Sequence, residues 1–217
     1  MKKQEIRTAE SGNEYTTRIV AAFGDVSGFG QWFDSLSNQE IELKPFMHIL
    51  DEEIDVFEDD PQYFVKRTGD GFLVIMELKQ GDNGREITNF ILQLVAMGSR
   101  LNKSIALQRY PRPEGYRIRV TSGFAWKKVH RGRTDYIARS INLASKLLRV
   151  GKSIPFILHE SVKDVVPKSA IRKHLFRFER TVVGSEFPDG VYRKDVDSLW
   201  SVRIKSSKSR KALKPTE

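Results

Sequence analysis

Two aspartates with glycine beside them are the residues of this sequence best suited to chemistry. Asp25 lies in FGDVSGFG, residues 23–30, and Asp70 lies in KRTGDGF, residues 66–72. A capping aspartate and an Asp-Gly turn are common, so either segment alone has an ordinary structural interpretation. Two carboxylates on separate strand ends, with glycines that let phosphate approach the backbone, instead suit a two-metal site for phosphoryl transfer. Such oxygen ligands favour Mn²⁺ or Mg²⁺.

The residues that follow Asp25 are suited to bind phosphate. Residues 17–23 form an apolar, β-branched run of strand length, and the turn Ser-Gly-Phe-Gly at 27–30 then opens a predicted helix. The first backbone N–H groups of a helix lack partners within it and attract anions. We therefore predict that the backbone at Gly28 and Phe29 contacts the phosphate chain of a substrate.

A third segment, RTDYIARSINLASKLLRV at residues 133–150, carries polar residues at helical spacing. Its apolar pattern predicts a helix over residues 136–150, closed by a glycine just past its end. Asn142 and Lys146 are four residues apart and would share one face of that helix, so both could reach one ligand. A surface helix with a solvated lysine is the alternative interpretation.

The elements around these segments alternate between strand and helix. Helices are predicted over residues 29–36, 40–57 and 85–106, and strands over 63–67, 72–78 and 116–125. The C-terminal third returns to mixed strand and helix, including a helical segment KSAIRKHL at 168–175. This order predicts an α+β fold with a ferredoxin-like, mainly antiparallel central sheet and helices on its faces.

Length and composition predict a single cytoplasmic domain. We expect residues 16–203 of the 217 to fold together, after a flexible segment 1–15 and before a basic, disordered tail 204–217. The absence of cysteine excludes disulfides, thiol catalysis and a thiolate zinc site. No apolar run approaches the roughly 18 to 20 residues that cross a bilayer, so we expect no membrane partner.

The net charge of +9 raises the question of nucleic-acid binding. Residues 203–217 contain six Lys or Arg and one acid, which places +5 of that charge on the predicted tail. The remaining excess is small for a nucleic-acid face, and no helix-turn-helix, zinc-finger or RNP signature is present. We therefore predict no nucleic-acid partner.

The three segments, taken in order, resemble the catalytic domain of class III adenylate and guanylate cyclases. The resemblance rests on an FxDxSGF element, a KxxGDG hairpin and a DYxxxxxNLASK helix, from about residue 17 to 150, with a weaker echo at 182–193. It implies closure of a nucleoside triphosphate to its 3′,5′-cyclic monophosphate with two Mn²⁺ or Mg²⁺ ions. It also implies a head-to-tail homodimer with active sites at the subunit interface.

The resemblance also implies a role for each motif residue. Asp25 and Asp70 match the two metal-binding aspartates, which one subunit contributes. Lys66 matches the lysine that contacts the base in adenylate cyclases, and Asp135 matches its partner in the base pocket. Both of these residues would come from the opposite subunit.

The asparagine-bearing segment matches the family with departures. Asn142 matches the asparagine that orients the ribose, and Lys146 stands where the family usually has a transition-state arginine; both would also come from the opposite subunit. Lysine keeps the charge but loses the bidentate fork, which predicts weaker or differently aimed stabilisation of the phosphate. The usual glycine before the asparagine-bearing turn and the late phosphate-binding lysine have no match.

The base is open, because a lysine donor beside a carboxylate acceptor suits more than one nucleobase. The motifs diverge around Ala138, Arg139 and Lys146, and no sensor module is seen. Both features resemble the free-standing cyclases of bacterial Pycsar anti-phage systems, whose pyrimidine product activates a separate effector. We predict UTP as substrate, then CTP. The alternatives are an adenylate cyclase that makes cyclic AMP, and an inactive cyclase-homology module for dimerisation or nucleotide sensing, which would be expected to lose a metal aspartate.

Overall fold

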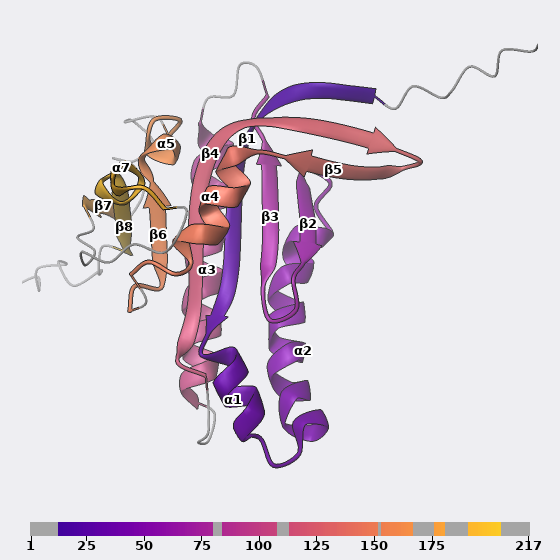
Figure 1. Ribbon diagram of the computed structural model, residues 1–217, viewed down its shortest axis with the longest axis vertical. Coiled ribbons are helices and arrows are strands. Elements are labelled where there is room, and N and C mark those ends of the chain that lie inside the picture. Colours follow the sequence, from indigo (N-terminus) through magenta and orange to yellow (C-terminus); the bar gives the residue numbers. More distant parts are fainter. Residues whose placement is uncertain are drawn as a thin grey trace, which may run out of the picture.

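One mixed sheet forms the centre of the molecule (Figure 1). The computed structural model describes residues 13–79, 84–107, 113–151, 153–166, 176–180 and 191–204. Its strands are β1 (Asn13–Ser27), β2 (Tyr63–Arg67), β3 (Phe72–Glu77), β4 (Gly115–His130), β5 (Arg133–Ile137), β6 (Phe156–His159), β7 (Phe176–Arg180) and β8 (Leu199–Ile204). Their order is β2-β3-β1-β4-β6-β8-β7, with β5 on β4, and within this part of the chain only β4 and β6 run parallel.

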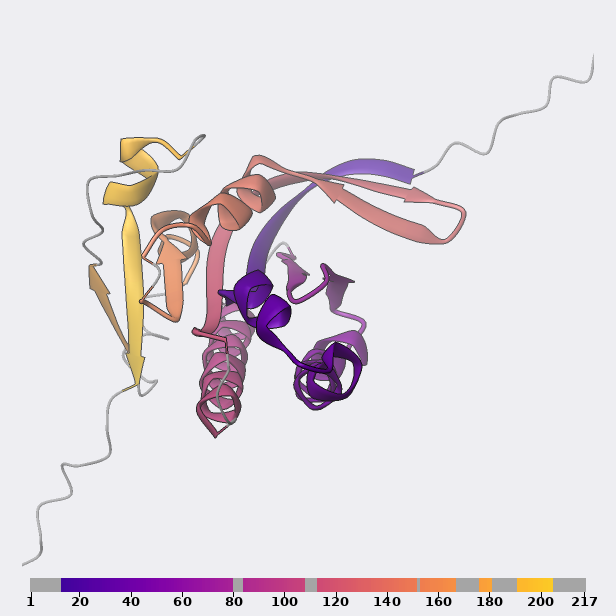
Figure 2. The ribbon, with the colours of Figure 1, turned by 60° about the horizontal axis from the view of Figure 1, so that its bottom comes forward.

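Helices cover both faces of this sheet. They are α1 (Phe29–Ser35), α2 (Gln39–Glu58), α3 (Arg85–Leu107), α4 (Arg139–Leu147) and the short α5 (Glu160–Lys163) and α7 (Arg193–Asp197). Two views show α2 and α3 on one face and α4 on the other (Figures 1 and 2). This arrangement confirms the predicted α+β fold with a mainly antiparallel sheet.

The main core lies between the sheet and the helices α2 and α3. On α2 the buried positions recur at helical spacing; they are Phe46, Leu50, Ile54 and Phe57. They pack with apolar residues of α3 and with one face of β1, β3 and β4. Burying a side chain of this size contributes roughly 1.5–3 kcal/mol, so this layer fixes the sheet on which the polar residues are placed. Among the described helices, none is both long enough and apolar enough to cross a membrane.

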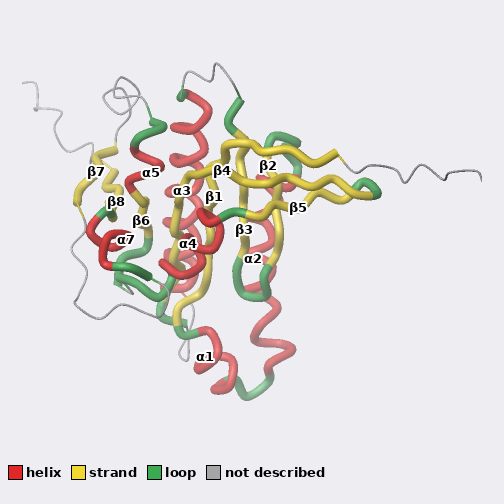
Figure 3. Tube along the Cα trace, turned by 45° about the horizontal axis from the view of Figure 1, so that its top comes forward, coloured by secondary structure: helices red, strands yellow, loops and turns green. Residues whose placement is uncertain are grey.

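The strands β1, β4 and β5 extend past the helices as an arm (Figure 3). β1 starts at Asn13, paired with Val129, so residues 13–15 of the segment predicted to be flexible belong to a strand. At the tip, Arg131 and Gly132 adopt positive φ values of 51° and 75° and turn the chain back into β5. The observed strand β4, at Gly115–His130, is therefore longer than the strand predicted over residues 116–125.

The prediction of a helix from residue 136 is wrong at its start. Tyr136 and Ile137 lie in β5, paired with Lys127 and Trp126, and α4 begins at Arg139. The tight turn at the tip of the arm returns the chain beside β4, where aromatic and β-branched side chains suit a strand. The ring of Tyr136 also packs on Phe64 of β2, with the ring centroids 5.1 Å apart.

Several predictions concern residues that lie outside the described ranges. These are the helical segment at 168–175, most of the weaker motif at 182–193, and the tail beyond residue 204. The predicted helices near α1, α2 and α3 and the strands β2 and β3 are observed within about one residue of their predicted ends.

Candidate active site

Strand pairing brings Asp25 and Asp70 to the same end of the sheet. Gly24 of β1 pairs with Phe72 of β3, and Asp70 lies in the turn just before that strand. A Cβ atom on Gly71 would lie 2.3 Å from the Gly24 carbonyl oxygen, so only glycine permits this approach of the two strands. The close contact of the two backbones therefore sets the distance between the two carboxyl groups.

The two carboxyl groups lie close enough to perturb one another. Burial raises the pKa of Asp25 to about 6, and the negative charge of Asp70 and a hydrogen bond with it contribute to the rise, while Arg117 opposes the shift. The pKa of Asp70 is also raised, chiefly by burial. Two partly buried carboxylates whose charge is incompletely neutralised favour the binding of a cation.

Arg117 is a functional candidate that the sequence reasoning missed. It faces Asp25 across β1 and β4, and its Nη2 lies 3.3 Å from Asp25 Oδ2. Its Nη1 donates to the carbonyl of Leu148 at 2.8 Å, and the side chain is only 10% exposed. A guanidinium in this place is suited to a phosphate oxygen. The available signal was an arginine inside an apolar strand, where charged residues are rarely buried without a partner.

A cavity of about 540 Å³ opens at these groups. Its lining residues are Phe23, Asp25, Thr68, Arg117, Ser145, Leu148 and Arg149. One carboxylate, two guanidinium groups and two hydroxyls thus meet at one opening. A carboxylate that attracts a cation, beside arginines that attract an anion, suits the complex of a divalent cation with a polyphosphate.

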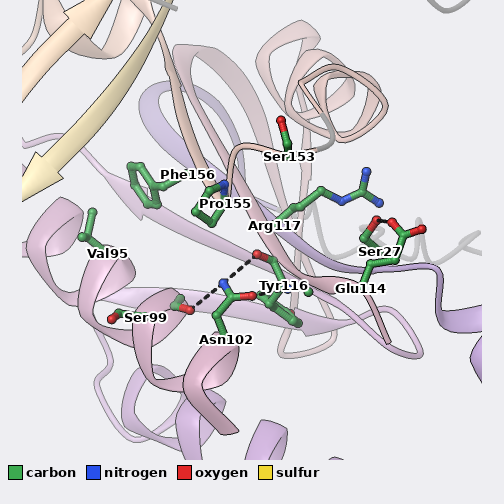
Figure 4. Close-up of a pocket in the computed structure, with 12 residues that line it drawn as sticks. Ser27, Val95, Ser99, Asn102, Glu114, Tyr116, Arg117, Ser153, Pro155 and Phe156 are labelled. Atoms are coloured by element: carbon green, nitrogen blue, oxygen red, sulfur yellow. Dashed lines mark hydrogen bonds between the residues drawn. The ribbon is translucent and has the colours of Figure 1, made fainter. Parts of the chain in front are cut away.

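Arg117 also borders a second cavity, of about 740 Å³, between α3 and the start of β4 (Figure 4). Asn102 of α3 fixes this end of β4, because its Oδ1 accepts from the Tyr116 N–H at 2.7 Å and its Nδ2 donates to the Tyr116 carbonyl at 2.9 Å. Ser27 at the end of β1 donates to Glu114 at 2.6 Å. The start of the strand that carries Arg117 is therefore tied to both α3 and β1.

Gly28 and Phe29 lie where the strand enters α1. Gly28 is the N-cap residue with φ 73°, which favours glycine, and no side chain caps the helix or brings an acid into its first turn. The ring of Phe29 packs on Trp32 and Phe33, with centroids 5.6 and 5.8 Å away. Phe29 therefore serves the core with its side chain, so a phosphate here would contact the backbone of the turn, beside which the Glu114 carboxylate lies.

The other four predicted residues lie away from the Asp25 cavity within one chain. Asn142 and Lys146 line a separate cavity of about 400 Å³, together with exposed Phe124 and Ile137. The face of α4 that carries Ser145 and the turn that carries Arg149 border the Asp25 cavity instead. The helix α4 therefore separates two polar surfaces.

Lys66 and Asp135 are on strands rather than gathered in a pocket. Lys66 of β2 pairs with Leu73, and Asp135 of β5 pairs with Lys128; both are exposed. Asp135 thus lies on a different element from Asn142, not on one continuous helix with it. A single chain does not bring these two residues to Asp25.

The carboxylate pair fits a divalent metal bound together with a substrate. Within the described ranges no three His, Asp or Glu side chains form a cluster that could hold an ion. Magnesium is commonly bound by one or two carboxylates, with water and substrate phosphates as the other ligands. Asp25 and Asp70, with their raised pKa values, offer this donor set.

Solved structures that superimpose on this chain include two cyclases and a related protein. The adenylyl cyclase CyaB from P. aeruginosa gives a TM-score of 0.59 at 16% identity, over 88% of this chain and 96% of that one. The catalytic core of a rhodopsin-guanylyl cyclase with converted specificity, in complex with ATPαS, gives 0.54 at 14%, over 90% and 100%. A class III adenylyl cyclase-like ATP-binding protein from Pseudomonas aeruginosa gives 0.57 at 14%, over 80% and 41%. The chain has the class III nucleotide cyclase fold.

The likeness to cyclases comes from the structure and not from the overall sequence. No protein-family model and no curated protein matches the sequence. At identities of 16% and below, the superpositions establish the cyclase fold alone. Any activity must therefore be argued from the residues at the end of β1, the β2–β3 turn and the start of β4.

Proposed function

We propose that this protein is a class III nucleotide cyclase that converts a nucleoside triphosphate to its 3′,5′-cyclic monophosphate and pyrophosphate. One observation carries the proposal: Asp25 and Asp70 lie together with raised pKa values, beside a buried Arg117, in a cyclase fold. Two partly buried carboxylates so close together destabilise the free protein, and such pairs occur often at functional sites, which supports the proposal.

Asp25 and Asp70 would hold the divalent ions, Mn²⁺ or Mg²⁺. When bound, such ions lower the pKa of the ribose 3′-hydroxyl and neutralise charge on the phosphates. Arg117 would contact the phosphate chain with the N–H groups that now face Asp25. The backbone N–H groups at Gly28 and Phe29, at the start of α1, would contact the phosphate chain.

A homodimer would complete the site with residues of a second chain. Asn142 and Lys146 face away from their own Asp25 cavity, which supports their use by a partner. Asn142 would orient the ribose, and Lys146 would meet the negative charge that develops on the phosphate. Lys66 and Asp135, both exposed, would contact the base.

The apolar surface beside Asn142 supports association with a second copy. In the single chain, Phe124 is 71% exposed, Trp126 55% and Ile137 68%. These side chains lie on the arm near the cavity that Asn142 and Lys146 line. Large exposed apolar side chains grouped in this way usually mark an interface.

For the base we propose UTP, then CTP, with a role in bacterial anti-phage defence through a separate effector. The support is the resemblance of the divergent segment 138–146 to free-standing pyrimidine cyclases. Adenylate cyclase activity is the second candidate, because the solved structures with this fold include an adenylyl cyclase and a rhodopsin-guanylyl cyclase core bound to ATPαS. A nucleotide-binding module is the third candidate, since another solved structure with this fold is described as an ATP-binding protein.

A direct assay separates these candidates. The purified chain is incubated with each of the four ribonucleoside triphosphates and Mn²⁺, and the products are identified by mass spectrometry. Cyclic UMP or cyclic CMP supports the full proposal, and cyclic AMP supports the second candidate. Nucleotide binding with no pyrophosphate released would refute the enzymatic proposal. Asp25→Asn and Asp70→Asn should abolish turnover in a folded protein, and Asp34→Asn, an exposed aspartate on α1, is the matched control.

The shared site is tested by mixing inactive chains. A chain with Asp70→Asn keeps its α4 residues, and a chain with Asn142→Ala keeps its carboxylates. Mixed dimers of the two should therefore contain one complete site out of two and recover activity. If purified mixed dimers remain inactive, the sites are not shared in this way.

A further inference from the structure

The strand β4 holds α4 through a row of alternate residues. Side chains two apart on a strand point to the same face, and the row facing α4 is Arg117, Arg119, Thr121 and Gly123. Three of these side chains donate hydrogen bonds to backbone carbonyls of α4 or of the turns that follow it. The helix that carries Asn142 and Lys146 is thus fixed by polar contacts as well as by packing.

Arg119 binds the C-terminal end of α4. The residue is fully buried, with 0% exposure. Its Nε donates to the Leu147 carbonyl at 3.0 Å, and its Nη2 donates to the carbonyls of Val150 and Gly151 at 3.0 and 3.1 Å. The last carbonyls of a helix have no partners within it and carry partial negative charge, so a cation there is favourable.

The other end of α4 is fixed by close contact with the same strand. Thr121 Oγ1 donates to the Ser140 carbonyl at 2.7 Å, in the first turn of the helix. A Cβ atom on Gly123 would lie 3.1 Å from the Ser140 Cβ, so the small residue lets the helix approach the strand. Both ends of α4 are therefore held at defined positions along β4.

Burial of Arg119 costs free energy that an apolar residue would avoid. Burial and the nearby charge of Arg117 lower the pKa of Arg119 to about 9. Replacing a buried charged group by an apolar one of similar volume is often neutral or stabilising. Packing alone therefore gives no reason for a guanidinium at this place, whereas the carbonyl of Leu147 in α4 and those of Val150 and Gly151 in the turn that follows do.

We propose that Arg119 is a positioning residue that fixes the C-terminal turn of α4, so that Lys146 and Asn142 are presented to the substrate of the partner chain. This inference rests on the proposed function. Lys146 lies in the last turn of α4, one residue before the Leu147 carbonyl that Arg119 binds. Arg117, two residues earlier, donates to the Leu148 carbonyl but also contacts Asp25, so it belongs to the carboxylate half of the site as well.

Arg119→Lys should consequently recover activity in only one kind of mixed dimer. An Arg119→Lys chain would keep its carboxylate half and lose its α4 half. An Asp70→Asn partner supplies an intact α4, so this pair should recover one of the two sites. An Asn142→Ala partner lacks the same half and should give no recovery.

The experiment measures turnover of Arg119→Lys alone and in both purified mixed dimers. Alone, its kcat should fall by about 10- to 100-fold, the usual effect of losing a residue that orients catalytic groups, with a smaller change in KM. Arg100→Lys is the matched control, because exposed Arg100 makes a paired contact with Glu53 on another helix. Undiminished turnover, or recovery by Asn142→Ala instead of Asp70→Asn, would overturn the inference.

A second readout separates this inference from the cyclase proposal. Hydrogen exchange of the backbone amides at 144–151 should accelerate at least about tenfold in Arg119→Lys and stay unchanged in Arg100→Lys. If the wild-type chain forms no cyclic nucleotide, the cyclase proposal fails, and the exchange result alone decides whether Arg119 holds α4. Unchanged exchange in Arg119→Lys would contradict the positioning role.

Discussion

Replacing Asp25 by Asn should stabilise the metal-free protein while abolishing turnover. The folded chain binds the Asp25 proton with a pKa of about 6, above the ordinary value of 3.8. Between these values the folded state holds more protons than the unfolded state, so the free energy of unfolding falls as pH rises through this window. The asparagine side chain would remain neutral, so the free energy of unfolding of the variant would not fall in this way. The advantage of the variant should therefore be absent below about pH 4 and complete above about pH 7.

The size of the effect follows from the pKa shift. The difference between 3.8 and about 6 corresponds to at most about 3 kcal/mol, with the attraction of Arg117 already included. The side chain of Asp25 is 31% exposed, and solvent screening reduces this value to about 1–2 kcal/mol. In a chain of this length, that free energy raises the melting temperature by roughly 3–6 °C.

The assay is thermal unfolding at pH 5 and pH 8, with chelator and with Mn²⁺. Wild-type protein should melt below Asp25→Asn at pH 8 in chelator, and the difference should shrink at pH 5. Added Mn²⁺ should stabilise the wild type, by about 2.7 kcal/mol at a hundred times its Kd, and leave Asp25→Asn nearly unchanged. Asp34→Asn should follow the wild type throughout. If Asp25→Asn melts below the wild type in chelator at pH 8, the ionised carboxylates of Asp25 and Asp70 do not destabilise the metal-free protein, and the reasoning is refuted.

Three further changes test the geometry around this pair. Gly71→Ala should cost about 1–3 kcal/mol in urea unfolding and lower turnover, because its Cβ would meet the Gly24 carbonyl; Gly30→Ala, in open space, should do neither. Tyr116→Phe should raise the free energy of unfolding by about 1 kcal/mol, since the Tyr116 hydroxyl is buried with no hydrogen-bond partner among the described residues. Arg117→Lys should raise KM for the triphosphate about tenfold in steady-state kinetics, because lysine keeps the charge and loses the fork.

Local signals in the sequence were sufficient for most of the elements and for the fold class. The apolar period of α2 and α3 and the Asp-Gly turn between β2 and β3 depend on neighbouring residues, and each was predicted close to its observed position. The start of α4 was predicted wrongly, because residues 136–138 suit either a helix or a strand. The Arg131–Gly132 turn and pairing with β4 decided in favour of the strand.

The residues of the candidate site also divide into those that the sequence indicated and those that it did not. Residue types and motif order singled out Asp25 and Asp70 as a pair, although each motif alone has an ordinary structural interpretation. Arg117 and Arg119 were missed, because their partners lie far away in sequence: Arg117 is 92 residues from Asp25, and Arg119 is 28 residues from Leu147. Such pairs depend on strand register and helix docking, and residue spacing contains no direct record of either.

The sequence by itself determined which chemical groups are present and which elements carry them, because carboxylate chemistry, helical periodicity and turn formation are properties of residues and their neighbours. The tertiary structure decided which of these groups come into contact. Pairing of β1 with β3 and β4 brings Asp25 to Asp70 and Arg117, and docking of α4 on β4 turns Asn142 and Lys146 away from that cavity. These contacts depend on burial and hydrogen bonding between distant segments, and they form only once the sheet has formed.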